Sequence, residues 1–352
     1  MKKILAFIIT LTVLLGCSPA FAEGMKRQAV RGSPLGTGVL ASGECGDKVT
    51  WTLGIDETLT ISGEGDMYNY SNENKAIKPP WNSFFQKDSV KNVVILPGVT
   101  SIGDFAFSDC ESIISVTISD SVTVIGDSAF SCCTNLSSIT IPDSVTAIGD
   151  SAFYCCYSLT SIELPDSVTV IGDNAFHLCE SLANIKLSGS LTEISNNAFC
   201  SCDSLESIII PNGVTVIGSD AFFDCDNLVS VTIPDSVTTI GFDAFMFCRS
   251  LPSVIIPNSV RVIENGAFKD CLSLASIVIP NSVATIGMHV FCGCENLTSI
   301  MIPNSVTIIG DHAFDKCNNL EDVYYSGSEA QWKKIRIWNY NDCLKNATLH
   351  FA

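Results

Sequence analysis

Residues 125–146 of this chain read I-G-D-S-A-F-S-C-C-T-N-L-S-S-I-T-I-P-D-S-V-T, and variants of this stretch fill most of the sequence. The isoleucine that opens it returns every 23 residues without an insertion or deletion. Its positions are Ile102, Ile125, Ile148, Ile171, Ile194, Ile217, Ile240, Ile263, Ile286 and Ile309. Such a period is typical of a solenoid, in which each repeat forms one coil and buries its apolar side only against neighbouring coils.

The order of residue types within one repeat predicts its local structure. Apolar and hydroxyl side chains alternate over residues 136–141, which indicates a short strand with one buried face. Pro142 and Asp143 then predict a turn, because proline presets φ and aspartate bonds nearby backbone. Asp127 stands where it would N-cap a helical turn over residues 128–130.

The repeat resembles the BspA-like leucine-rich repeat family, whose pattern is I-G-x-x-A-F-x-x-C-x-x-L-x-x-I-x-I-P-x-S-V-T. Ten repeats match over residues 101–323, and the segments around Trp51, Trp81 and Trp332 are similar to the family's ends. The resemblance implies a leucine-rich repeat solenoid of the α/β class, dominated by strands. Its stacked 23-residue coils would form a curved parallel β-sheet with short helical turns and a cap at each end. The family is mostly exported and often described as binding or adhesive, and it offers no catalytic residues to carry over.

These patterns divide the chain into five segments. We expect a signal peptide at 1–22, a linker at 23–43 and an N-terminal cap with a partial repeat at 44–100. Ten leucine-rich repeats at 101–323 and a C-terminal cap at 324–352 complete the prediction.

The first segment has the features of an export signal. Lys2 and Lys3 precede an apolar run at 4–15, which is short for a membrane span. Residues 20–22 form a small-x-small cleavage site, which predicts free secretion. Cys17 ends a Leu-Leu-Gly-Cys sequence similar to a bacterial lipobox, so a lipid anchor at Cys17 is the alternative. Both alternatives predict a secreted or cell-surface protein.

Charge excludes some partners. The chain has 37 acidic and 19 basic residues and a net charge of -18, and residues 101–323 alone hold 26 acidic and 5 basic residues. Nucleic acid and anionic lipid require a basic face, so we expect neither as a partner, apart from membrane attachment through a lipid at Cys17.

Cysteine is frequent for a structural reason. Ten of the 17 cysteines occupy one position of the repeat, which predicts a ladder of small, buried, free thiols, with disulfides or metal sites as alternatives. The ladder consists of Cys110, Cys133, Cys156, Cys179, Cys202, Cys225, Cys248, Cys271, Cys294 and Cys317. Outside the ladder, Cys132 and Cys155 share a register and are the pair best placed for a bridge.

No residue pattern identifies a metal or cofactor site. His289 and His312 are one repeat apart and near Cys292 and Cys294, a set that would suit zinc, but ordinary surface histidines explain them equally well. The aspartate represented by Asp127 recurs from repeat to repeat and would suit loose cation binding, although helix capping explains it more simply. We therefore expect no metal and no cofactor.

Functional residues are expected at the positions that differ between repeats, because a residue present in nearly every coil stabilises the coil itself. The outward strand position changes from polar at the start to apolar at the end, which suggests a contact surface. Strand propensity is the alternative reason for isoleucine and valine there. The ligand-binding candidates are Glu163, Lys186, Ile209, Ile255, Val278, Met301 and Tyr324.

Together these observations predict a noncatalytic extracellular or cell-surface binding protein of the adhesion type. Its sheet face would recognise a protein or a glycan. The alternative is a structural or spacer surface protein without a specific ligand. An enzyme is disfavoured because the repeats contain no insertion from which to build a pocket.

Overall fold

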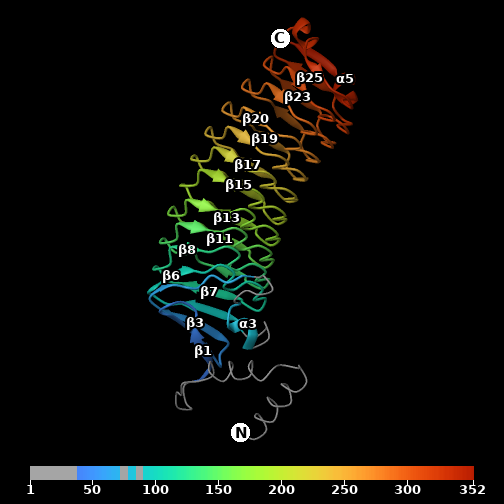
Figure 1. The fold of residues 1–352 in the computed structure, drawn as a ribbon. Coiled ribbons are helices and arrows are strands. Elements are labelled where there is room, and N and C mark those ends of the chain that lie inside the picture. Colours follow the sequence, from blue (N-terminus) through green and yellow to red (C-terminus); the bar gives the residue numbers. More distant parts are fainter. Residues whose placement is uncertain (1–37, 72–77, 85–89) are drawn as a thin grey trace.

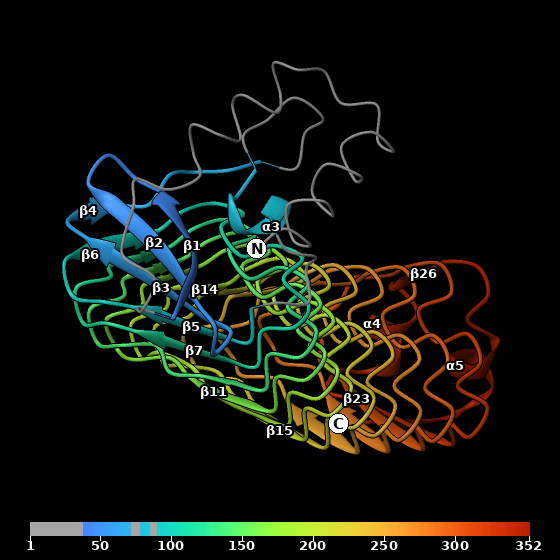
Figure 2. The ribbon, with the colours of Figure 1, turned by 90° about the horizontal axis from the view of Figure 1, so that it is seen from below.

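Each repeat of the sequence forms one coil, and the coils stack into an elongated, curved solenoid with β1 (Val39–Glu44) near one tip and α5 (Asp342–Asn346) near the other (Figure 1, Figure 2). The computed structural model describes residues 38–71, 78–84 and 90–352. The predicted strand-dominated solenoid is confirmed. The expected signal peptide and Cys17 lie outside the described residues.

Every coil contributes one strand to a main sheet and one strand, in most coils a shorter one, to a second sheet. The main-sheet strands are β5 (Asn92–Ile95), β7 (Ser115–Ile118), β9 (Ser138–Ile139), β11 (Ser161–Glu163), β13 (Asn184–Lys186), β15 (Ser207–Ile209), β17 (Ser230–Thr232), β19 (Ser253–Ile255), β21 (Ser276–Val278), β23 (Ser299–Ile302) and β25 (Asp322–Tyr325). The second-sheet strands are β6 (Val99–Ile102), β8 (Val124–Ile125), β10 (Ala147–Ile148), β12 (Val170–Ile171), β14 (Glu193–Ile194), β16 (Val216–Ile217), β18 (Thr239–Ile240), β20 (Val262–Ile263), β22 (Thr285–Ile286) and β24 (Ile308–Ile309).

Pairing between coils is parallel and in register at a spacing of 23 residues, as between Ile162 and Ile185 or Ile277 and Ile300. The regular ladder of the main sheet is interrupted between β9 and β11, between β13 and β15, and between β17 and β19. These interruptions divide the sheet into sections while the coils continue to stack.

The N-terminal cap begins as an antiparallel meander. Strand β1 (Val39–Glu44) pairs with β2 (Val49–Gly54), and β2 pairs with β3 (Thr58–Gly63). Strand β3 then pairs in parallel with β5 and so starts the main sheet. Most of β1 falls in the segment that we assigned to a linker. It has no fully buried residue and therefore no apolar alternation that would reveal it in the sequence.

The remaining cap elements close the two ends of the stack. At the N-terminal end these are β4 (Gly65–Asp66) and α3 (Trp81–Phe84). At the C-terminal end they are α4 (Glu329–Trp332), β26 (Arg336–Ile337), α5 (Asp342–Asn346) and β27 (Thr348–Phe351). Strands β26 and β27 extend the second and main sheets, respectively, by one strand.

The helical turn predicted over residues 128–130 is wrong. The segment forms successive turns in which Ser128 and Cys132 have left-handed φ angles of 52° and 58°. This alternation directs every second N–H out of the coil, so that Ser128 donates to the carbonyl of Asp150 and Cys132 to that of Tyr154, both at 2.7 Å. A lone coil would satisfy these groups by closing a helix, whereas a stacked coil satisfies them through its neighbour.

The predicted N-cap role of Asp127 is wrong for the same reason. The Asp127 carboxylate accepts the backbone N–H of Asp150 in the next coil at 2.9 Å, and Asp127 itself donates to Asp104 at 2.9 Å. A Cβ added to Gly126 would lie 2.5 Å from Oδ1 of Asp104, which explains why this position is glycine. The aspartate row therefore joins coils rather than capping helices.

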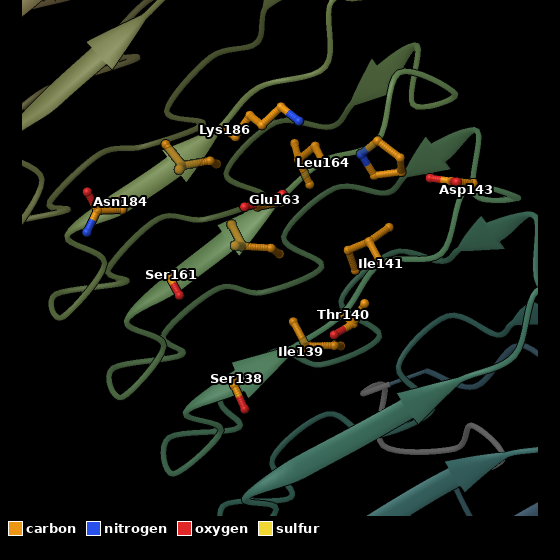
Figure 3. A pocket seen from close by; sticks show the side chains of 13 residues that line it. Ser138, Ile139, Thr140, Ile141, Asp143, Ser161, Glu163, Leu164, Asn184 and Lys186 are labelled. Carbon is orange, nitrogen blue, oxygen red and sulfur yellow. The ribbon is translucent and has the colours of Figure 1, made fainter.

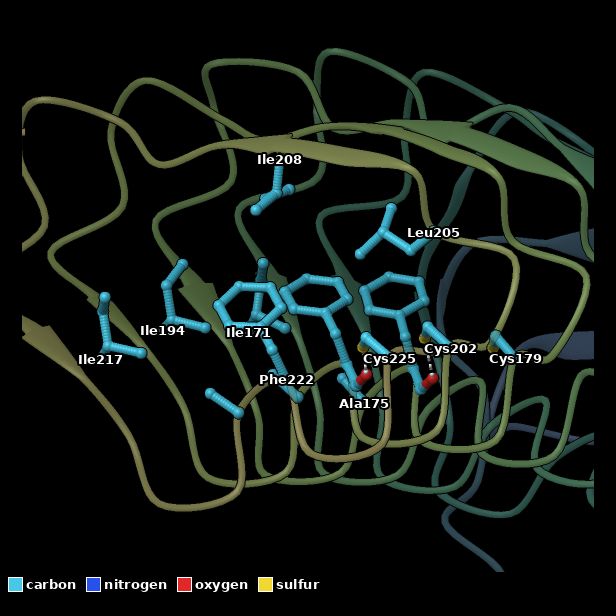
Figure 4. Packing of buried hydrophobic residues seen from close by; sticks show 14 of the residues in the cluster. Ile171, Ala175, Cys179, Ile194, Cys202, Leu205, Ile208, Ile217, Phe222 and Cys225 are labelled. Carbon is cyan, nitrogen blue, oxygen red and sulfur yellow. Dashed lines mark hydrogen bonds between the residues drawn. The ribbon is translucent and has the colours of Figure 1, made fainter. Parts of the chain in front are cut away.

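The core consists of rows of identical side chains (Figure 4). Phenylalanines from Phe107 to Phe314 stack with ring centroids 5.2 to 5.9 Å apart. Beside them runs the predicted cysteine ladder, with all its thiols free and buried. The ladder thiols also donate hydrogen bonds, as from Cys202 Sγ to the carbonyl of Phe176 at 3.2 Å. Burial raises the pKa of Cys202 well above its usual value, so this thiol remains protonated at neutral pH.

Replacing Cys202 by alanine is expected to lower the free energy of unfolding by about 1 kcal/mol, the size of one lost small apolar contact. The Phe176 carbonyl also accepts the N–H of Cys179 at 3.2 Å and is therefore not left without a partner. Denaturant unfolding of parent and variant measures the difference, with Cys132→Ala at the partly exposed position as the control. A loss above roughly 3 kcal/mol would mean that the thiol hydrogen bond contributes more than packing does.

Candidate binding surface

The outward side chains of the main sheet form a continuous row along the C-terminal half of the solenoid. Parallel pairing aligns Ile255 with Val278, Val278 with Met301, and Met301 with Tyr324. Their exposed fractions run from 84% at Ile255 to 42% at Tyr324. We call these four residues the apolar stripe. The predicted outward orientation is present at each position.

Ile209 lies in the same row but apart from the stripe. Its side chain is 73% exposed, and its partner on the next strand is the polar Thr232. The structure therefore separates Ile209 from the apolar stripe by one hydroxyl side chain.

The row continues into the C-terminal cap, which the sequence did not reveal. His350 pairs with Tyr324 across β25 and β27, and the two rings stack with centroids 4.7 Å apart. Nε2 of His350 lies 2.6 Å from Oδ1 of Asp322. Met301, Tyr324 and His350, with Phe351, line a hollow of about 250 Å³ at this end. His350 follows Tyr324 by 26 residues rather than 23, so a search at the repeat period misses it.

The strand and turn positions beside Ile255 and Val278 are polar but uncharged. Ser253 and Ser276 on the strands are exposed, and the turn residues Asn258 and Asn281 that follow are exposed asparagines. In the first half of the array the corresponding turns carry aspartate, as at Asp166. The sheet face around Ile255 and Val278 therefore carries asparagine where earlier turns carry aspartate, whereas the Asp322 carboxylate lies beside Tyr324 at the C-terminal end.

A second, larger hollow of about 650 Å³ lies over β9, β11 and β13 (Figure 3). Ser138, Ser161 and Asn184 form one line of side chains across it, and Glu163 and Lys186 stand in the adjacent line. Glu163 and Lys186 are exposed and directly opposite each other in parallel register. No ion pair within 4.0 Å joins these two described side chains, so both charges face solvent in the hollow.

The structure thus brings Glu163 and Lys186 into one polar hollow and the four stripe residues into one apolar row. Ile209 lies between the two groups.

The histidines predicted as an alternative zinc set are arranged as a stack. The rings of His289 and His312 lie 4.8 Å apart, and the ring of Tyr340 lies 4.1 Å from that of His312. Nδ1 of His312 pairs with Asp315 at 3.1 Å, and Cys294 donates to the carbonyl of Phe268. Within residues 38–71, 78–84 and 90–352, no group of three or more His, Cys, Asp or Glu side chains is placed to hold a metal ion.

Basic side chains on the repeats are few, and one of them is bound on the protein itself. Arg249 forms ion pairs with Asp224 and Asp226, and its guanidinium lies 4.7 Å from the ring centroid of Phe247. The described part of the chain contains no helix long and apolar enough to cross a membrane.

A family model described as the BspA type leucine rich repeat region, with six copies, matches residues 80–206 and 192–321. These matches cover well over half of the chain. The chain belongs to the BspA-type leucine-rich repeat family. The resemblance noted from the repeat pattern is therefore confirmed.

Solved structures of bacterial leucine-rich repeat proteins agree with the fold. A leucine-rich repeat protein from Bacteroides ovatus is 25% identical, with a TM-score of 0.61, over 87% of this chain and 89% of that chain. A leucine-rich repeat protein from Eubacterium ventriosum is 26% identical, with a TM-score of 0.53, over 80% of this chain and 84% of that chain. A comparison with curated proteins finds no match.

Proposed function

We propose that this BspA-type chain is an exported, noncatalytic binding protein that holds a protein ligand on its sheet face. The apolar stripe carries the proposal. Four large apolar side chains stand exposed in register on consecutive strands, at positions where the fold does not need them.

The composition of the stripe favours a protein as the ligand. Aliphatic and aromatic anchors surrounded by uncharged polar groups are typical of the centre of a protein interface. Three strand spacings give the stripe a length of about 14 Å, enough for several anchoring contacts. The stacked rings of Tyr324 and His350 extend this surface into the cap.

We expect the polar hollow over β9, β11 and β13 to form a second, charged part of the same interface. Glu163 and Lys186 offer a carboxylate and an ammonium group on adjacent strands. Opposite charges in a fixed order favour one orientation of a partner and contribute mainly to specificity. A glycan contact in this hollow and a spacer role without any ligand are the competing proposals.

Export rests on the N-terminal sequence. The charged start, the apolar run and the small-x-small site favour secretion, and Cys17 offers attachment to a lipid bilayer instead. Either location would expose the sheet face to proteins outside the cytoplasm.

Changing Val278 and Met301 together to serine is expected to weaken capture of the protein ligand at least tenfold, since apolar anchors dominate most interfaces. Stability should change little, because exposed substitutions usually cost at most about 0.5 kcal/mol each. The measurement is capture from surface extracts, identification of the retained protein, and titration of that protein against parent and variant.

The control is Thr117→Ala, at an exposed position of β7 on the same face but outside both hollows, which should have much less effect. Equal binding by the Val278/Met301 variant and the parent would remove the stripe from the interface. A large fall in melting temperature would mean that the two side chains serve the fold. The spacer alternative predicts that no protein is retained.

A further inference from the structure

Two cysteines outside the ladder lie at the same position of adjacent coils. Of the off-ladder cysteines in the described part of the chain, Cys132 and Cys155 are the two with this relation. Both have left-handed φ angles, 58° and 57°, and the N–H of Cys132 bonds the carbonyl next to Cys155 at 2.7 Å. Their Cα atoms therefore follow the coil spacing of about 4.8 Å, which is inside the range that disulfides span.

These two thiols differ from the ladder thiols in their contacts. A ladder thiol is enclosed and donates to a phenylalanine carbonyl, as Cys156 does to Phe130 at 3.3 Å. Cys132 is partly exposed, and its sulfur contacts the Ser131 hydroxyl at 3.8 Å and also interacts with the Cys155 side chain. Cys155 accepts a hydrogen bond from the Tyr157 hydroxyl at 3.4 Å, a donor on an exposed side chain. Both sulfurs can therefore turn toward each other without disturbing the core.

The pair also lies at a distinctive place in the fold. Cys132 precedes β9 and Cys155 precedes β11, and the main-sheet ladder is interrupted between these two strands. The polar hollow with Glu163 lies over the same coils. A covalent link between the two turns would add to the backbone hydrogen bonds that already join them, such as the one from Phe130 to the carbonyl of Ala152 at 2.8 Å.

We propose that Cys132 and Cys155 form a site of reversible disulfide formation that links the two coils carrying β9 and β11. The oxidant is a small-molecule disulfide of the kind found outside the cytoplasm. The Cys132 thiolate attacks one sulfur of this disulfide and releases one thiol. The Cys155 thiolate then attacks the Cys132 sulfur and releases the second thiol. Overall, two protein thiols are oxidised to one disulfide and one external disulfide is reduced to two thiols.

The geometry predicts that this bond is easily reduced. Side chains in parallel register keep their Cβ atoms about as far apart as their Cα atoms, whereas a relaxed disulfide requires about 3.8 Å. The turns must approach by about 1 Å, and strained disulfides have more oxidising potentials than structural ones. Burial raises the pKa of Cys132, which should make exchange faster as the pH rises.

The test treats the reduced, folded chain with oxidised glutathione and measures intact mass. We expect a loss of two hydrogens and no retained glutathione. Digestion at aspartate separates the two cysteines at Asp143 and Asp150, so non-reducing digestion should yield one linked peptide pair that contains Cys132 and Cys155. Dithiothreitol should restore the original mass, and the oxidised chain should melt at a higher temperature than the reduced chain.

Three variants sharpen the result. Cys155→Ser should stop at a glutathione adduct on Cys132, and Cys132→Ser should form neither adduct nor bridge. Cys200→Ser, a matched off-ladder control, should oxidise like the parent. A stable glutathione adduct on the parent, a bridge to any other cysteine, or an unchanged mass would each overturn the proposal. Circular dichroism of each variant confirms that the fold is intact before oxidation.

Discussion

Replacing Trp81 by alanine is expected to lower the free energy of unfolding by about 4 kcal/mol, within the range for removal of a buried tryptophan. The Trp81 ring is buried and stacks on Phe107 with centroids 5.4 Å apart. It also meets Trp51 and Tyr70 edge to face at 5.9 and 6.0 Å. The phenylalanine row of the repeats thus begins on a tryptophan of the cap.

Trp81 also supplies a hydrogen bond that a preceding coil would otherwise make. Within the array, the carbonyl of Ala129 accepts the N–H of Phe107 from the coil before it. At the carbonyl of Ala106, the donor found among the described residues is Nε1 of Trp81 at 2.9 Å. Trp81→Phe keeps most of the ring but removes this donor, so we expect a smaller loss of about 1–2 kcal/mol.

Denaturant unfolding and hydrogen exchange measure both effects. Because each coil contacts only its neighbours, exchange should increase first in the coils next to α3 and least at the C-terminal end. The control is Trp338→Ala, at an exposed tryptophan of the opposite cap, which should change stability little. Equal losses in Trp81→Ala and Trp338→Ala would refute a capping role for Trp81.

The 23-residue period was sufficient to predict the stacking of the coils and the outward position of Ile255 to Tyr324. The alternation of side chains along a strand determines which of them face outward. In-register stacking gives the same orientation to the equivalent residues of every coil. The polar hollow needed the structure, because it is formed jointly by side chains of the three neighbouring strands β9, β11 and β13. Nothing local in Ser138 or Ser161 signals that hollow.

The turns and the aspartate row show a limit of reasoning from a single repeat. Asp127 followed by Ala129 and Phe130 resembles a helix start when the coil is considered alone. In the stack, the N–H that donates to the Asp127 carboxylate belongs to Asp150, 23 residues later. Helix signals assume a local partner, whereas a solenoid provides an identical partner one coil away.

Changing Asn341 to leucine is expected to cost about 3 kcal/mol, because the N–H of Phe314 would lose its partner and the carbonyl of Gly310 would keep only the longer bond from Ala313 at 3.4 Å. Oδ1 of Asn341 accepts the N–H of Phe314 at 2.9 Å, and Nδ2 donates to the carbonyl of Gly310 at 2.8 Å. Inside the array, the matching N–H of Phe291 bonds the carbonyl of Ala313 in the next coil at 2.9 Å. One fully buried side chain therefore substitutes for the backbone of a missing coil.

Two further variants separate this capping role from simple burial of an asparagine. Asn341→Asp keeps the acceptor for Phe314 but removes the donor to Gly310 and buries a charge, so it should destabilise the chain at least as much as leucine. Asn319→Ala removes an exposed amide that donates to the carbonyl of Glu295 at 2.9 Å, and it should cost under about 1 kcal/mol. Urea unfolding ranks the three variants, and exchange at the Phe314 amide reports the lost bond directly. If Asn341→Leu proved no worse than Asn319→Ala, the last coil would have to satisfy its backbone through water, and the open end would need no cap.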